Sequence, residues 1–169
     1  MAAAEPITRT LTLSNRPKPK GPKRKRVPDL VRRERALAAT MNHFAGKAFD
    51  LGGADCVQLV HFHLRQMGHK GLPDPGGYAS PAGVTKRLKA LGFKNLEELF
   101  DSLLPRIAPA YMLPGDLALI QAEKGAPAWR AGTVVISTGR KFLGWHPDAE
   151  ILAVLFPIVE SPFIAAWRA

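Results

Sequence analysis

Apolar residues recur every three or four positions just after residue 28, which is the spacing of one face of an α-helix. The apolar set is Leu30, Val31, Leu37, Met41 and Phe44. Asp29 suits the N-cap of this helix, and Gly46 suits its end. The pattern therefore predicts a first helix over about residues 29–45, with one face buried.

A second helical pattern begins at Cys56, continues through Leu59, Val60, His63 and Met67, and stops at Gly68. The two glycines of Asp50-Leu51-Gly52-Gly53-Ala54-Asp55 predict a sharp turn before this helix. We expect Asp55 to be its N-cap, because a carboxylate there accepts hydrogen bonds from the backbone N–H groups of the first turn. Cys56 then lies at or near the first helical position.

Shorter elements follow a Gly- and Pro-rich loop over residues 70–83. Two short helices are predicted at about 82–91 and 95–104, with Asn95 as the cap of the second. After Pro105 the pattern changes to short β-branched or apolar runs separated by turn residues. These runs predict strands at 117–120, 133–136, 141–145 and 151–156, the last of them the final clear strand.

Helices come first along this chain and an antiparallel meander follows, which indicates an α+β fold with the N-terminal helices packed on the sheet. The chain has 169 residues, the size of one ordinary domain. Its single cysteine excludes an intramolecular disulfide and a cysteine-based zinc site. No apolar run reaches the roughly 18–20 residues that span a bilayer, and no signal-peptide pattern opens the chain.

The net charge of +10 is concentrated at the N-terminus. Residues 1–28 hold eight basic side chains and one acidic one, a net charge of +7, together with five prolines. We interpret this segment as an extended basic arm, either disordered or bound to a partner, ahead of one domain over residues 29–169. The basic residues expected to bind a partner are Arg16, Lys18, Lys20, Lys23, Arg24, Lys25 and Arg26.

The arm has two further features that leave its role open. Residues 7–13 alternate apolar and polar side chains, so they could add a strand to the sheet of a partner. Lys23-Arg24-Lys25-Arg26 resembles a nucleic-acid-binding or nuclear-import patch, although no aromatic residues are interleaved for base stacking. An electrostatic or assembly role is therefore favoured over sequence-specific recognition.

Cys56 is the candidate nucleophile of the chain, and a small core residue is the competing interpretation. The helix dipole favours its thiolate, whereas the adjacent Asp55 disfavours it. His61 and His63 are two residues apart on the same helix, so they diverge and share no metal. His63 is also about 10 Å along the helix from Cys56, too far to act as its base. We expect neither a metal nor a cofactor.

A cysteine that leads a helix, followed by a Gly-Asp turn into an antiparallel sheet, resembles the NlpC-type cysteine peptidases of the papain-like fold. Residues 29–169 look still more like a family of unknown function from tailed phages and prophages. The matching motifs are the glycine turn into Asp55-Cys56, Gly76-Gly77-Tyr78, Gly115-Asp116 and Ala166-Trp167-Arg168.

In catalytic NlpC-type proteins the cysteine attacks an amide of a peptidoglycan stem peptide, and a histidine takes its proton. The resemblance matches Cys56 to this nucleophile and places the histidine just before residues 131–134. Trp129 and Arg130 occupy those positions, and neither is a general base, although Arg130 could stabilise a thiolate. His146 is the one downstream histidine, in a predicted turn two strands later, and is the remaining candidate base.

The resemblance implies a structural or assembly component of a phage or gene-transfer-agent tail tip, built on an inactive cysteine-peptidase-like domain. Its partners would be other tail proteins, such as the hub or the distal tail protein, and its location the virion after synthesis in the cytoplasm of the host. One alternative is an active peptidoglycan cysteine endopeptidase that helps the genome enter the cell. Another is a nucleic-acid-binding accessory protein that acts through the arm.

Overall fold

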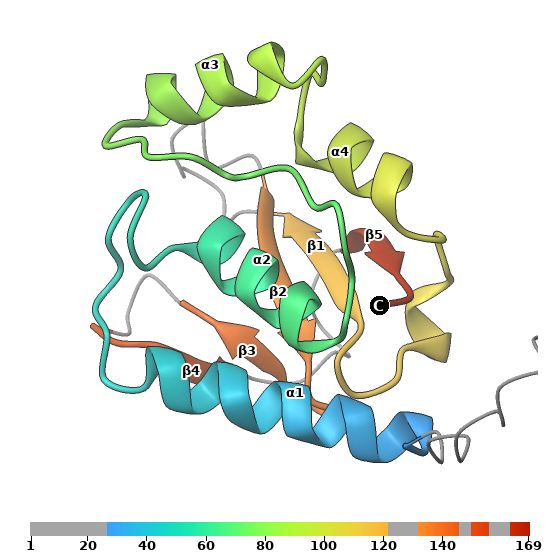
Figure 1. Cartoon of the computed structure of the whole chain (residues 1–169). Coiled ribbons are helices and arrows are strands. Elements are labelled where there is room, and N and C mark those ends of the chain that lie inside the picture. Colours follow the sequence, from blue (N-terminus) through green and yellow to red (C-terminus); the bar gives the residue numbers. More distant parts are fainter. Residues whose placement is uncertain (1–26, 122–131, 146–149, 156–162) are drawn as a thin grey trace, which may run out of the picture.

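The computed structural model describes residues 27–121, 132–145, 150–155 and 163–169. Within these residues the fold is α+β, with helices layered on one antiparallel sheet (Figure 1). The helices are α1 (Asp29–Phe44), α2 (Cys56–Gln66), α3 (Pro81–Ala90), α4 (Leu96–Leu103) and a short 3₁₀ helix η1 (Pro109–Tyr111). The strands are β1 (Leu117–Gln121), β2 (Gly132–Ser137), β3 (Phe142–Gly144), β4 (Ala153–Leu155) and β5 (Phe163–Trp167).

The sheet has the strand order β4-β3-β2-β1-β5, and each neighbouring pair is antiparallel. The predicted meander is confirmed as β1 to β4. The expectation that the run at 151–156 is the final strand was wrong, because β5 follows it and pairs with the outer edge of β1. Two successive alanines, which are poor strand formers, weakened the strand pattern of β5.

The main core lies between the sheet and the pair α1–α2, which cover one of its faces (Figure 1). Strand β2 shows how the alternation of a strand divides its side chains between the two faces. Val134 and Ile136 are fully buried against the helices, whereas Val135 lies in a second apolar cluster with Ala118 and Phe142. Helix α2 packs directly on this strand, as the helix-first pattern predicted.

The predicted buried face of α1 needs correction at both ends. Leu30 is 59% exposed and Met41 is 39% exposed, although both belong to the apolar set. The buried face instead consists of Arg33, Ala36, Leu37, Thr40 and Phe44. Asp29 is not the cap either: Pro28 is the N-cap residue and makes no side-chain cap bond. The Asp29 carboxylate instead pairs with the guanidinium groups one turn later, at Arg32 and Arg33.

Helices α3 and α4 lie above α2, away from α1 (Figure 1). Both were predicted within one or two residues, and the Asn95 side chain caps α4 by accepting from the Glu98 backbone N–H. No residue of α3 is fully buried, so this helix is held by the half-buried face it turns toward α2. Within the described residues, no helix combines the length and apolar character needed to cross a bilayer.

Candidate functional site

The N-terminus of α2 is built as the sequence predicts. Cys56 is the first residue of the helix, and the Asp55 side chain is its cap. One carboxylate oxygen of Asp55 accepts from the Val57 and Gln58 backbone N–H groups, both at 2.9 Å. The other accepts from the Gly52 N–H at 2.7 Å, which fixes the glycine turn to the helix. Both oxygens of this buried carboxylate are therefore engaged by the backbone.

The glycine turn lies against the segment that contains Gly76-Gly77-Tyr78. Gly52 has a φ of +84°, and a Cβ at this position would lie 2.1 Å from the Tyr78 carbonyl oxygen. Only glycine satisfies both the backbone conformation and this close approach. The Gln58 side chain also donates to the Gly76 carbonyl at 3.3 Å. Two of the motifs that carry the family resemblance thus form one structural unit around Cys56.

The thiol of Cys56 is held in its protonated form. Burial, followed by the charge of Asp55, raises the pKa of Cys56 to about 11. Backbone groups of Val134 and of the first turn of α2 act in the opposite direction but do not compensate. Desolvation and the neighbouring carboxylate therefore raise the pKa of Cys56 by more than the helix dipole lowers it. The sequence alone left open which of these effects is larger.

The strand beside Cys56 offers no proton acceptor in its described part. Gly132 and Val134 are on the face of β2 that meets the helices, and neither carries a titratable group. Trp129 and Arg130, the positions matched to the family histidine, lie outside the described residues, as does His146. The seven basic arm residues, from Arg16 to Arg26, also lie outside them.

His63 is a structural residue at the junction of three segments. Its side chain is fully buried, with Nδ1 3.1 Å from the Thr40 hydroxyl of α1 and Nε2 3.0 Å from the Gly115 carbonyl. Burial lowers the pKa of His63 to about 4, so the ring is neutral at pH 7. His61 is half-buried on another face of α2, which agrees with the prediction that the two rings diverge. Within the described ranges, no cluster of His, Cys, Asp or Glu side chains could hold a metal ion.

A second cluster, around Asp116, joins the other two motifs and was not predicted. The fully buried Asp116 carboxylate pairs with Arg33 at 2.8 Å and with Arg168 at 3.0 Å. It also accepts from the Leu113 and Ala169 backbone N–H groups. The Gly115-Asp116 and Ala166-Trp167-Arg168 motifs are therefore partners in one buried ion network.

Arg33 connects that network to α1. Its guanidinium is buried and also donates to the Pro114 carbonyl and to the Ala169 backbone oxygen. Sequence patterning missed this role because an arginine in a helix is normally assigned to the solvent face. One signal was present: Arg33 lies four residues before Leu37, on the stripe of residues predicted to be buried.

The sequence matches one protein family over residues 26–169, and its description is "Domain of unknown function (DUF6950)". This match covers most of the chain, including both motif clusters, so the chain belongs to that family. No curated protein matches the sequence.

Proposed function

We propose that this member of the DUF6950 family is a non-catalytic, papain-like domain of NlpC type that serves as a structural or assembly component of a phage or gene-transfer-agent tail tip. Residues 1–28 form the basic arm that binds neighbouring tail proteins. The fold layout supports this proposal, because a cysteine-led helix packs on an antiparallel sheet that opens after Gly115-Asp116.

The environment of Cys56 carries the proposal that the domain has no peptidase activity. Acyl transfer by a cysteine requires a base within about 3 Å to take the thiol proton and return it to the leaving amine. Asp55 does not fill this role, because both its oxygens accept backbone hydrogen bonds. Tyr78 does not fill it either, since burial and Asp55 raise the pKa of its hydroxyl far above the usual range.

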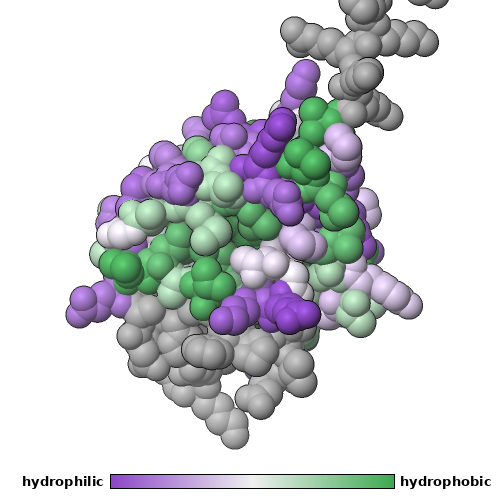
Figure 2. Space-filling view, turned by 90° about the horizontal axis from the view of Figure 1, so that it is seen from below, coloured by the Kyte–Doolittle hydropathy of each residue, from purple (hydrophilic) through white to green (hydrophobic). Residues whose placement is uncertain are grey.

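The surface at the root of the arm supports an assembly role. Val27 is 50% exposed and Leu30 is 59% exposed, although both are large apolar residues. Figure 2 shows apolar residues grouped on this face at the end where the described chain begins. Grouped exposed apolar residues are typical of interaction surfaces, and the adjoining arm adds a charge of +7 that favours an acidic partner.

The expected absence of peptidase activity is tested with purified protein, intact peptidoglycan and stem-peptide fragments. We expect no cleavage above background, because loss of general acid–base catalysis alone costs about a hundredfold to ten-thousandfold in rate. Cys56→Ala and His146→Ala variants are measured in parallel. Robust cleavage that both substitutions abolish would establish the endopeptidase alternative instead.

Thiol alkylation tests the same conclusion without a substrate. Because the pKa of Cys56 is about 11, its rate of reaction with iodoacetamide should be at least about a hundredfold below that of a free cysteine at pH 7. The rate should then rise about tenfold per pH unit from pH 7 to 10. The denatured protein is the matched control. A native rate that levels off near pH 7 would mean that a cation or base activates the thiol.

Deletion of residues 1–28 tests the role of the arm. The truncated protein should keep its melting temperature and lose incorporation into particles. A full-length variant with Lys23, Arg24, Lys25 and Arg26 changed to glutamine separates charge from length. Normal incorporation of the truncated protein would refute the assembly role. DNA binding that weakens steeply as salt rises, and disappears in the glutamine variant, would favour the nucleic-acid alternative.

A further inference from the structure

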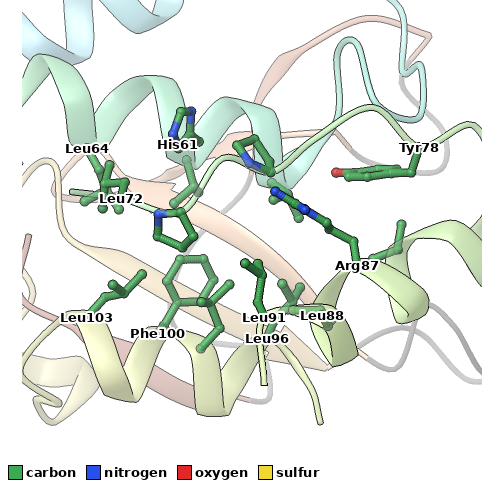
Figure 3. A pocket seen from close by; sticks show the side chains of 16 residues that line it. His61, Leu64, Leu72, Tyr78, Arg87, Leu88, Leu91, Leu96, Phe100 and Leu103 are labelled. Atoms are coloured by element: carbon green, nitrogen blue, oxygen red, sulfur yellow. The ribbon is translucent and has the colours of Figure 1, made fainter. Parts of the chain in front are cut away.

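An apolar pocket lies between α2, the segment over residues 72–78, and the helices α3 and α4 (Figure 3). Leucine, proline, valine and phenylalanine side chains form nearly all of its lining. Its interior leaves about 50 Å³ of free space, whereas one water needs about 10–15 Å³ on the same measure. The pocket therefore has room for an aliphatic group of about four heavy atoms.

Tyr78 brings an unsatisfied hydroxyl to this pocket. The residue is only 9% exposed, and its hydroxyl makes no hydrogen bond of normal geometry to any group that the structure describes. Burial raises the pKa of the Tyr78 hydroxyl, and the charge and side-chain contact of Asp55 raise it further. The Asp55 oxygens, however, already accept from the backbone N–H groups of the glycine turn and of α2. A buried donor without an acceptor destabilises the fold, so a hydroxyl in this position favours a ligand that accepts a hydrogen bond from it.

Arg87 supplies a positive charge at the same end of the pocket. Figure 3 shows its guanidinium extending from α3 toward the hydroxyl end of Tyr78. Its Nε and Nη2 atoms donate to the Asp74 carbonyl at 3.2 and 2.6 Å, which holds the group at the rim. Arg87 is the one charged residue among those described as lining the pocket. The Asp74 carboxylate does not line it and accepts from the Gly76 N–H.

We propose that this pocket binds a short, branched aliphatic carboxylate, a small molecule whose carboxylate lies between the Tyr78 hydroxyl and the Arg87 guanidinium. The hydroxyl donates one hydrogen bond to the carboxylate, and the guanidinium adds a charge-assisted one. The aliphatic end enters the apolar interior between α2 and α4. The pocket adjoins the Cys56 turn but needs no chemistry from the thiol, so this site is independent of any peptidase activity.

The structure also indicates how the ligand would enter. Helix α3 contributes no fully buried residue, and its half-buried Val84 and Leu88, with Leu91 at its C-cap, are wall residues of the pocket. A helix without a fully buried residue can move outward at lower cost than α1 or α2, which each bury several residues. The bound ligand would then fill the free space of the pocket and contact both α2 and α3, which holds α3 against α2.

The test is a titration of the full chain with 4-methylpentanoate, followed by the NMR signals of the leucine and valine methyl groups. We expect saturable shifts at Leu72, Leu88 and Leu91. The neutral isostere 4-methylpentanamide should bind about tenfold more weakly, because it lacks the charge that Arg87 pairs with. Absence of saturable shifts at these methyl groups, or equal binding of the acid and the amide, would overturn the proposal.

Two variants separate the proposed contacts from general electrostatics. Arg87→Gln should weaken binding of 4-methylpentanoate about tenfold. Lys86→Gln removes an exposed charge from the same helix, outside the lining, and should leave binding unchanged. Equal weakening by both would show nonspecific charge attraction and would refute the site. A peptide ending in leucine that binds when the free acid does not would refute a small-molecule ligand.

Tyr78→Phe distinguishes a ligand-binding hydroxyl from a structural one. Loss of a structural hydroxyl should lower the melting temperature, whereas loss of a ligand-binding hydroxyl should raise it. Without ligand, the variant should melt about 2–4 °C higher than the natural protein, because it removes an unsatisfied buried hydroxyl and keeps the ring. Its affinity for 4-methylpentanoate should fall about threefold to tenfold. A lower melting temperature with unchanged affinity would mean that Tyr78 donates to Asp55 and that its hydroxyl does not bind a carboxylate in the pocket.

Discussion

The Asp116 cluster and the Cys56 turn are both polar sites beside the same sheet, and they differ in how completely their polar groups are paired. Asp116 is fully buried, and its oxygens have four partners: two guanidinium groups and two backbone N–H groups. At the Cys56 turn, the Asp55 carboxylate is satisfied by backbone N–H groups and the thiol is protonated, whereas the Tyr78 hydroxyl makes no hydrogen bond of normal geometry within the described residues.

This difference separates a structural site from a binding site. A buried charge is tolerated when geometry and hydrogen bonds satisfy it, and the Asp116 network meets that condition without a ligand. A buried polar group left unpaired costs stability, and such groups are retained where something else pairs with them. Two clusters that the sequence marks equally, each by two short motifs, therefore have different roles.

The first prediction is that Asp116→Asn strongly destabilises the fold. The substitution removes the negative charge that faces the buried Arg33, and we expect the free energy of unfolding to fall by about 3–5 kcal/mol. Lys94→Gln, which removes one member of an exposed pair with Glu98, should cost less than about 1 kcal/mol. Urea denaturation measures both. A small effect of Asp116→Asn would mean that the network is not the structural site described here.

The second prediction concerns pH and His63, which joins the Asp116 turn to α1 and α2. The folded pKa of about 4 lies below the ordinary value of 6.5, so the unfolded chain binds the proton more readily. Stability is therefore fully present above about pH 6.5 and is lost as pH falls toward 4, by about 3 kcal/mol in total.

His63→Gln isolates this contribution from that of the carboxylates, which titrate in both proteins. The variant will be less stable at pH 7, because glutamine does not reproduce both ring hydrogen bonds to Thr40 and Gly115. Its free energy of unfolding should vary less between pH 7 and 4. The difference between the pH dependences of the two proteins gives the contribution of His63. Parallel pH dependences would show that His63 does not titrate on unfolding.

The third prediction tests whether the glycine turn and Tyr78 form one unit. Gly52→Ala makes a methyl group clash with the Tyr78 carbonyl oxygen and requires alanine to adopt a left-handed backbone conformation. We therefore expect the free energy of unfolding to fall by about 2 kcal/mol or more. Gly77→Ala is the matched control, since a Cβ there meets nothing within 4 Å. It should change stability by less than about 0.5 kcal/mol. Similar effects of the two substitutions would contradict the close approach of the turn to Tyr78.

Much of the fold could be predicted because its signals are local. The Asp55 cap, the Cys56 start of α2 and the Asn95 cap of α4 each depend on residues within three positions. The four strands of the meander follow from β-branched runs and the turns between them. Strand β5 was missed because its place is set by pairing with β1, more than 40 residues earlier in the chain.

Only part of the candidate site could be predicted from the sequence. The sequence pattern indicated Asp55 and Cys56, and the structure places them at one helix terminus as expected. It did not find Arg33, whose partners Pro114, Asp116 and Ala169 are 81, 83 and 136 residues away. It noted Tyr78 as part of a motif, but not that its hydroxyl would be buried.

Local sequence was enough to predict the caps of α2 and α4, the turns and the sequential order of β1 to β4, because hydrophobic spacing and capping act between near neighbours. The packed fold was needed to show that a guanidinium and a carboxylate are buried together, that the Cys56 thiol stays protonated and that Tyr78, which lines an apolar pocket, has a buried hydroxyl. Each of these depends on desolvation by segments distant in the chain, and solvent exclusion is a property of the packed fold rather than of any local pattern.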